Sequence, residues 1–428
     1  MLATRYEQVR KTTEAICRPL AIEDYGVQPM ADASPPKWHL AHTTWFFETF
    51  LLKAFVTGYR PFHERFEYLF NSYYNGIGHP YPRARRGALS RPTVAEVLQY
   101  REHVDAAMAA LLARGDEQID SRIELGLHHE QQHQELLLTD IKYTLGTNPL
   151  LPAYRSDLCT AAAAGPNDRA RTRTYTEFDG GIIGIGAAAD EGFCFDNELP
   201  RHEVMLRPFA LADAPVTNGE FLAFVEDAGY ERPELWLSDG WAALSAAPSI
   251  RAADRPPAAD GRSGPLYWYR RDGEWYEYRL SGPTPVEPRA PVAHVNYYEA
   301  DAFARWSGRR LPTEQEWERA AVGRPVSGNF ADTQALHPLP PARPEAGSLR
   351  ALFGDVWEWT SSPYMPYPGY RPLPGTLGEY NGKFMSNQLV LRGGSCVTQP
   401  NHMRLTYRNF FYPGDRWQFS GIRLAQDI

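Results

Sequence analysis

Apolar residues recur with a helical period through the first third of the chain. The stretch WHLAHTTWFFETFLLKAF is apolar along most of its length, and Ser34, followed by two prolines, is expected to cap the start of this helix. Thr93 and Glu96 form a capping-box pattern before a second helix, and IELGLHHEQQHQELLLTDIKYTL has the pattern of a third. With the amphipathic N-terminal stretch MLATRYEQVRKTTEAIC, these segments predict a bundle of four helices whose interior can hold a metal.

The pattern changes after about residue 155. Residues 156–174 include the small, polar and basic run AAAAGPNDRARTRT, which predicts an exposed linker. From residue 175 onward aromatic residues, glycines and prolines crowd together, and NGEFLAFVEDAG and NYYEADAFARWSG are the clearest helical segments. Residues 242–265 have the composition of a variable surface insertion. We therefore predict an α+β protein, with a helical domain over residues 1–155 and a loop-rich mixed domain over residues 175–428.

The composition narrows the class of function. A length of 428 residues favours two domains, and 43% hydrophobic with 22% charged residues is typical of a folded globular protein. A formal net charge of -8 argues against nucleic-acid and acidic-membrane partners, so small molecules are the expected ones. The four cysteines form no CxxC pair, and no apolar run has the length of a signal core or a membrane span. We expect a cytoplasmic protein.

The third helical segment contains the string HEQQH. His129 and His133 are four residues apart and share one face of a helix, so both imidazoles can bind one cation. In a zinc peptidase of the HExxH type, Glu130 would be the general base and a third ligand would follow downstream. The positions that a peptidase would use hold Leu136 and Thr139, which weakens that interpretation. Two buried histidines that only satisfy hydrogen bonds are the simpler alternative.

The better third ligand lies upstream, at His42 on the helix that follows Ser34. His39 and His128 are the competing choices, although neither shares the face of the others. Three neutral imidazoles on one side of an octahedral ion leave positions open for dioxygen and a substrate. The ligand type alone still permits zinc, copper or nickel.

Several strings spread through both halves resemble one family. WHLAHTTWFFE, FNSYYN, RARRGALSRPT, HHEQQHQELLLTDIK, RLTYRNFF and RWQFSGIRLA resemble the sulfoxide synthases of ergothioneine biosynthesis. PVTNGEFLAFV, RRLPTEQEWERAA, GDVWEWTSS and LRGGS are similar to the formylglycine-generating-enzyme fold, a C-type-lectin-like domain, and the first half resembles a DinB-like helical bundle. The resemblance implies a non-haem iron(II) held by His42, His129 and His133.

The reaction implied by this family joins sulfur to C2 of the imidazole of hercynine, using dioxygen, and oxidises the sulfur to a sulfoxide. The resemblance places the proton donor at Tyr73 or Tyr74. It also places Asn409 and Phe410 near the imidazole and the ammonium of hercynine, with Gln132 near the polar groups. A metal- or thiol-binding scaffold without catalysis is the non-enzymatic alternative, and oxygen consumption would distinguish the two.

The second substrate is predicted from three further residues. Phe411 stands where relatives that use γ-glutamylcysteine carry an acidic residue, so it favours the free-cysteine branch. Arg83 is expected to bind the cysteine carboxylate, with Arg86 as a helper. The loop GHPYPR departs from the family pattern, and this keeps a selenoneine synthase, which joins a selenosugar to hercynine, as the main alternative.

Overall fold

The computed structural model describes residues 2–158, 173–246, 264–341 and 349–428, which fall into two compact units. One unit is Met1–Thr144 together with Leu373–Tyr380, and the other is Leu145–Pro372 together with Asn381–Ile428. Most of the predicted linker, and most of the predicted surface insertion at residues 242–265, lie outside the described residues. No helix among the described residues is both long and apolar enough to cross a membrane.

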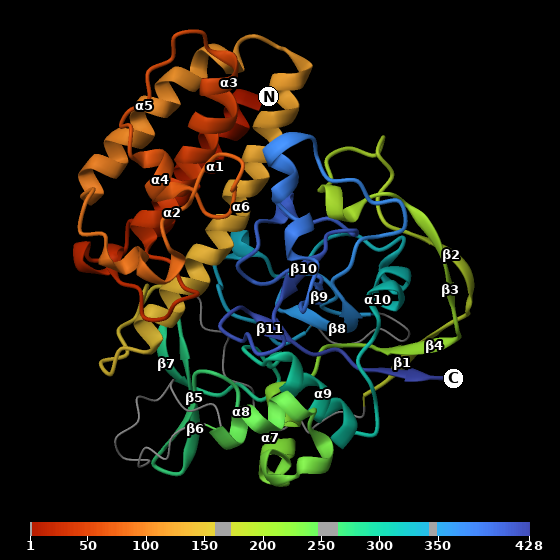
Figure 1. Ribbon diagram of the computed structural model, residues 1–428. Coiled ribbons are helices and arrows are strands. Elements are labelled where there is room, and N and C mark those ends of the chain that lie inside the picture. The colour runs from red at the N-terminus through yellow and green to blue at the C-terminus, as the bar shows by residue number, and fades with distance from the viewer. Residues whose placement is uncertain (1, 159–172, 247–263, 342–348) are drawn as a thin grey trace. The chain divides into compact units, whose positions relative to one another are not determined.

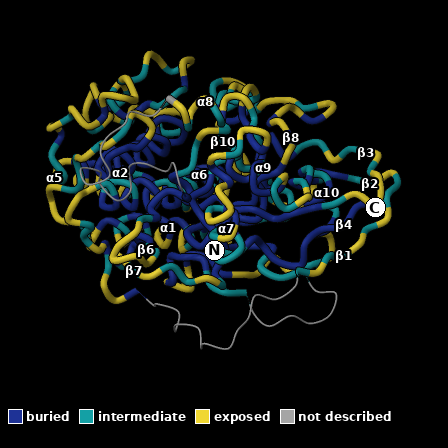
Figure 2. The backbone as a smooth tube through the Cα atoms, turned by 90° about the horizontal axis from the view of Figure 1, so that it is seen from below, coloured by how far each residue is buried: buried dark blue, intermediate teal, exposed yellow. Residues whose placement is uncertain are grey.

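Four long helices form the first unit, as the sequence predicts (Figure 1). They are α1 (Leu2–Cys17), α2 (Pro36–Phe47), α5 (Val94–Leu112) and α6 (Glu117–Gly146). All twelve residues of α2 are buried, so it is the central helix of the unit (Figure 2). Short helical elements fill the connections: η1 (Ile22–Gly26), η2 (Glu48–Leu52, a π-helical turn), α3 (Lys53–Phe55), α4 (Phe66–Phe70) and η3 (Arg83–Ala88).

The structure confirms the predicted N-cap of α5 but not that of α2. Thr93 and Glu96 form the predicted capping box of α5. Ser34, in contrast, does not cap α2, because Pro35 occupies the N-cap position and no side chain caps the helix. The Ser34 hydroxyl instead accepts a hydrogen bond from Arg86 at 2.8 Å. Ser34 lies one residue too far from the helix start to reach its free N–H groups.

A buried ionic network connects α1, α5 and α6. The Glu130 side chain is fully buried, and its carboxylate accepts hydrogen bonds from Arg10 at 2.8 Å, Arg101 at 3.0 Å and Thr13 at 2.6 Å. A buried carboxylate is tolerated only when such partners compensate its charge. Close packing brings α6 against α2 as well: a Cβ atom at Gly126 would lie 2.7 Å from Cε1 of Phe47, so a larger residue there would require the Phe47 ring to move.

The second unit is built from short strands and helices around several small sheets. The sheet orders are β10-β9-β8-β11, β1-β4-β12, β5-β6-β7 and β2-β3. The two predicted helices are present as α7 (Asn218–Glu226) and α9 (Tyr297–Trp306), and each begins with a capping box. Helices and sheets together confirm the α+β class. The other elements are α8 (Ser238–Ala246), α10 (Glu314–Ala321), β1 (Tyr175–Phe178), β2 (Gly181–Ile185), β3 (His202–Leu206), β4 (Phe209–Ala212), β5 (Trp268–Arg271), β6 (Glu274–Arg279), β7 (Gly282–Pro285), β8 (Trp357–Pro363), β9 (Leu389–Arg392), β10 (Asn409–Phe411), β11 (Ser420–Gly421) and β12 (Ala425–Asp427).

One short segment from late in the chain belongs to the helical unit. Leu373–Tyr380, which contains the helical turn η9 (Gly375–Glu379), groups with residues 1–144. The Glu379 carboxylate accepts hydrogen bonds from the backbone N–H groups of Asn75 at 3.0 Å and Gly76 at 2.8 Å. The segment therefore supports the turn that contains the two tyrosines singled out in the sequence.

Candidate metal centre

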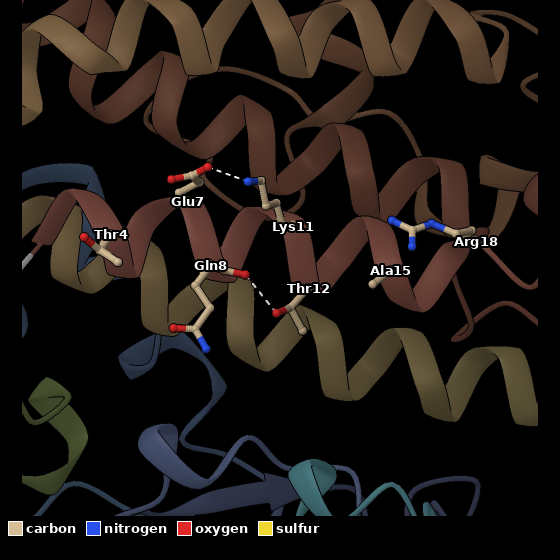
Figure 3. A pocket seen from close by; sticks show the side chains of 7 residues that line it. All are labelled: Thr4, Glu7, Gln8, Lys11, Thr12, Ala15 and Arg18. Atoms are coloured by element: carbon tan, nitrogen blue, oxygen red, sulfur yellow. Dashed lines mark hydrogen bonds and ion pairs between the residues drawn. The ribbon is translucent and has the colours of Figure 1, made fainter.

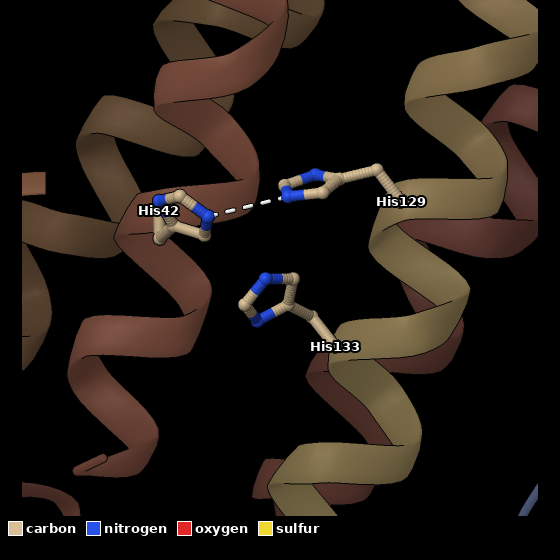
Figure 4. Close-up of side chains that lie close together, drawn as sticks. All are labelled: His42, His129 and His133. Atoms are coloured by element: carbon tan, nitrogen blue, oxygen red, sulfur yellow. Dashed lines mark hydrogen bonds between the residues drawn. The ribbon is translucent and has the colours of Figure 1, made fainter. Parts of the chain in front are cut away.

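Three histidines from two helices converge inside the helical unit. His42 comes from α2, and His129 and His133 come from α6, one turn apart on the same face. One ring nitrogen from each lies within 4.8 Å of the others, and Nε2 of His42 is 3.2 Å from Nε2 of His129. Figure 4 shows the three rings facing a common point, with one nitrogen of His133 directed between the other two. The structure thus brings together the three predicted ligands.

A hydrogen bond orients the His42 ring, and stacking on Phe46 orients the His129 ring. Nδ1 of His42 lies 2.6 Å from the carbonyl oxygen of Phe70, which can only accept, so Nδ1 carries the proton and Nε2 keeps its lone pair. His129 is held by stacking, with its ring centroid 4.5 Å from that of Phe46 and an interplanar angle of 26°. Both rings therefore direct a nitrogen toward the centre.

Burial keeps the three imidazoles neutral. His42, His129 and His133 are 0%, 1% and 9% exposed, respectively. Burial lowers the pKa of His129 to about 3. Burial, followed by the neighbouring histidines, also lowers the pKa of His42 and His133 well below the ordinary value. Neutral imidazole is the form that binds a metal, so the cluster is ready for a cation at physiological pH.

The donor set fits a divalent transition metal. The cluster holds three nitrogen donors and no carboxylate among the described residues, which suits iron, zinc, copper or nickel and disfavours magnesium or calcium. Three protein ligands leave coordination positions open for small molecules. Iron and copper are the ions among these that react with dioxygen, so the ligand set alone does not select between them.

The competing residues point elsewhere. His128 lies 2.7 Å from the Arg5 guanidinium on α1, and His39 lies beside His133 without belonging to the three-ligand group. Glu130, the base of the peptidase interpretation, is bound to Arg10 and Arg101 on the far side of α6. A carboxylate held by two guanidiniums has no lone pair directed at a metal-bound water, so the geometry disfavours a peptidase.

Three tyrosines form a contiguous group of rings that reaches the cluster through Tyr380 and His129. Tyr74 is fully buried, its ring stacks on Tyr73 at 4.7 Å, and burial raises its pKa well above the ordinary value. Tyr380, which the sequence interpretation missed, packs its ring against His129 at 5.6 Å and donates its hydroxyl hydrogen to the side-chain oxygen of Gln132. No local pattern could have identified Tyr380, because 248 residues separate it from Gln132.

The two arginines of the predicted carboxylate site differ in their surroundings. Arg83 is exposed and donates to the backbone oxygen of Asp32. Arg86 is 3% exposed, donates to the hydroxyls of Ser34 and Ser72, and lies over the Trp38 ring at 3.3 Å from its centroid. Burial, followed by the charge of Arg83, lowers the pKa of Arg86 well below its usual range, which marks a cation that a bound anion would stabilise.

The three residues predicted near hercynine at the C-terminal end belong to the second unit. Asn409, Phe410 and Phe411 form β10, which pairs antiparallel with β9. Phe410 stacks on Tyr364 with ring centroids 4.0 Å apart and an interplanar angle of 11°. Phe411 packs edge-on against Trp417 at 5.9 Å. An aromatic ring such as Phe410 can attract a quaternary ammonium, whereas Phe411, the next residue of the same strand, points to the opposite face of the sheet.

A hollow on the outer face of α1 has a different character (Figure 3). Its lining is the exposed stripe of the helix, where Glu7 pairs with Lys11. Solvated pairs of this kind contribute little to binding, so we assign the hollow no part in the chemistry. It is lined by Thr4, Glu7, Gln8, Lys11, Thr12, Ala15 and Arg18.

Comparison with known proteins agrees with this architecture. A DinB superfamily model matches residues 5–137, and a sulfatase-modifying factor enzyme 1-like domain model matches residues 160–341 and 326–428, which confirms the predicted types of both domains. The hercynine oxygenase of Mycolicibacterium thermoresistibile is 32% identical over 99% of this chain and 95% of its own length. That of Mycobacterium tuberculosis is 33% identical over 92% of this chain and 91% of its own. The formylglycine-generating enzyme of Streptomyces coelicolor is 30% identical over 62% of this chain and 94% of its own. The chain therefore belongs to the hercynine oxygenase family of oxidoreductases.

Proposed function

We propose that the protein is an iron(II)- and dioxygen-dependent enzyme that forms a carbon–sulfur bond at C2 of the hercynine imidazole. The second substrate is cysteine, and the product is hercynylcysteine sulfoxide, an intermediate of ergothioneine biosynthesis. The observation that carries this proposal is the buried cluster of three neutral histidines, to which no carboxylate of the described residues is added. When bound there, iron(II) would supply the electrons that activate dioxygen.

A proton must be supplied beside the histidine cluster, because reduction of dioxygen consumes protons. The tyrosine hydroxyls are the groups available for this step, and Tyr73 and Tyr74 are the residues that the family resemblance indicates. Tyr380 is a third candidate, because its ring contacts His129 and its hydroxyl is oriented by Gln132. A hydroxyl held by an amide oxygen keeps its proton until a stronger acceptor is present. We therefore favour Tyr380 as the donor.

The second substrate is proposed from the charge of Arg86. Its buried guanidinium donates to the neutral hydroxyls of Ser34 and Ser72, and a carboxylate at such a cation would gain strong charge-assisted bonds. Cysteine carries a carboxylate, whereas a selenosugar offers hydroxyls instead. Arg83, three residues earlier on the same helical turn, adds positive potential at the surface. This supports cysteine as the substrate, with Arg86 as the main anchor and Arg83 as its neighbour.

Hercynine has a quaternary ammonium, a carboxylate and an imidazole, and it needs an aromatic face and an amide. Asn409 and Phe410 have the required chemistry, and their assignment to hercynine rests on the family resemblance. Phe411 adds an apolar ring where an acidic group would be needed to bind a γ-glutamyl ammonium. This is consistent with free cysteine as the thiol.

Reactions with each candidate second substrate, offered one at a time, test the proposal. The enzyme, loaded anaerobically with iron(II), is given hercynine, oxygen and one of cysteine, γ-glutamylcysteine or a selenosugar, and the product is weighed by mass spectrometry. We expect a sulfoxide from cysteine, and Arg86→Gln should raise the KM for cysteine by roughly 10- to 100-fold, the cost of losing a hydrogen bond to a charged group. Arg85→Gln, which changes an exposed arginine of the same turn, is the matched control. Product only from the selenosugar would make the enzyme a selenoneine synthase, and no oxygen-dependent product from any substrate would refute the proposal.

A further inference from the structure

A second pair of polar residues lies directly behind one of the three ligands. His39 is 2% exposed and sits on α2, three residues before His42. Its Nδ1 is 2.9 Å from Nδ1 of His133, and its Nε2 is 3.0 Å from Oδ2 of Asp140. Asp140 is itself 4% exposed and lies on α6, seven residues after His133. A continuous chain of hydrogen bonds thus runs from Asp140 through His39 to His133.

The direction of each hydrogen bond follows from the groups that can only accept or only donate. Oδ2 of Asp140 also accepts from the backbone N–H of Ser34 at 2.8 Å, so this oxygen is an acceptor and the proton of the next bond lies on Nε2 of His39. A neutral His39 then has a lone pair on Nδ1 and must accept from Nδ1–H of His133. His133 consequently keeps its lone pair on Nε2.

This tautomer directs the lone pair of His133 toward the other two histidines. In Figure 4 the ring nitrogen of His133 that points between His42 and His129 is the one remote from its Cβ, which is Nε2. The opposite tautomer would place a proton at that position and block a metal. Isolated neutral histidine prefers the proton on Nε2, so the environment has to favour the other form.

We propose that Asp140 and His39 are positioning residues that hold His133 in the Nδ1-protonated form and direct its Nε2 toward the metal. His42 obtains the same orientation from the Phe70 carbonyl. Nδ1 of His129, in contrast, is buried without a hydrogen-bond partner among the described residues, so the three ligands are held unequally. Outer partners of this kind raise the basicity of a ligand and fix its ring.

The first test is a direct measurement of the tautomer in the metal-free full-length protein. Ring-nitrogen NMR of protein labelled with ¹⁵N-histidine, assigned by loss of one signal set in His133→Gln, reports which nitrogen of His133 carries the proton. We expect Nδ1. A proton on Nε2 would overturn the proposal whatever the variants do, and this measurement needs neither hercynine nor oxygen, so its outcome is independent of the proposed function.

The second test is the affinity for iron(II), measured anaerobically against a chromogenic chelator. His39→Leu and Asp140→Ala should each weaken binding by roughly 10- to 100-fold, the usual effect of removing an outer partner. The double variant should be no weaker than His39→Leu alone, because Asp140 acts through His39. His128→Leu is the matched control, since His128 is equally buried but bonds Arg5, and it should bind like the parent. Parent-like affinity in both single variants would refute the proposal. Losses that multiply in the double variant would refute the claim that Asp140 acts through His39.

Discussion

Replacing Glu130 by Gln distinguishes a structural carboxylate from a catalytic one. Glu130 is the residue that the HExxH pattern would make a general base, yet its carboxylate is fully buried between Arg10 and Arg101. Burial alone would raise the pKa of Glu130, but the two guanidiniums outweigh it and hold the pKa at about 2. The side chain is therefore charged at every pH of interest and serves as the counter-ion of both arginines.

The size of the effect follows from this pairing. Glutamine keeps the shape and one acceptor but removes the charge, so Arg101 retains Glu14 at 3.2 Å and Arg10 retains Asp105 at 2.8 Å as their remaining acidic partners. Breaking a buried ion pair by removing one partner costs about 3–5 kcal/mol where a buried charge is left without compensation, and the remaining acidic partners favour the lower end of that range here. For a domain of this size that corresponds to a fall in melting temperature of roughly 6–20 °C.

Scanning calorimetry of the full-length protein measures this change, with turnover per iron-loaded molecule recorded well below the transition. We expect a large fall in the lowest melting temperature and near-parental turnover in the molecules that remain folded. Glu124→Gln is the control on the same helix, because Glu124 forms only a partly exposed pair with Arg5, worth less than about 1 kcal/mol. An unchanged melting temperature together with lost turnover and retained iron would mean that Glu130 takes part in the chemistry.

Three further predictions concern the histidines and the tyrosines. His42→Ala removes one of three ligands and should reduce iron content after anaerobic loading to below about a tenth of the parental value, while His128→Ala should load normally; equal loading of both would show that His42 is not a ligand. In the metal-free protein the pKa of His129 is lowered to about 3. The unfolded chain therefore takes up a proton near pH 6.5 that the folded chain does not. The stability contributed by this residue is present above that pH and is lost as the pH falls below it. Urea titrations should show a loss of roughly 1.4 kcal/mol from this residue between about pH 7.5 and 5.5, and His129→Gln should remove that share of the slope. Among Tyr73→Phe, Tyr74→Phe and Tyr380→Phe we expect Tyr380→Phe to reduce sulfoxide formation by about 100-fold or more with iron retained, and unchanged turnover in all three would exclude a tyrosine as the proton donor.

The helices and the candidate ligands were accessible from the sequence because both depend on short-range patterns. Residues four apart on a helix share a face, so the spacing of His129 and His133 is enough to identify them as a pair. The capping box at Thr93 depends on a spacing of three residues and is present as predicted. His42 required the family resemblance as well, since the helical period disfavoured His39 and His128 but could not show which residue of another helix faces the pair. The structure brings His42 together with His129 and His133, as Figure 4 shows.

The partners of these ligands were not accessible in the same way. Ser34 has the residue type of a helix cap, but its hydroxyl is bound by Arg86, 52 residues away, and local propensity gave no sign of that contact. His39 was considered only as a rival ligand, because its role depends on Asp140 and His133 on another helix. Contacts between distant segments depend on how the helices pack, and side-chain identity along one helix does not specify them.

Tyr380 belongs to a late segment of the chain that packs with the helical unit. It lies inside the range matched by the sulfatase-modifying factor model, residues 326–428, yet it packs with the helical unit and contacts His129. Its neighbour Glu379 binds the backbone of the turn at Asn75 and Gly76, immediately after Tyr73 and Tyr74. A bundle cut at the boundary expected from the sequence would retain all three histidines but lose this tyrosine and the support of that turn. We therefore expect metal binding and catalysis to separate in such a fragment, because the three candidate ligands come from one domain and the proposed proton donor comes from a segment of the other domain's sequence.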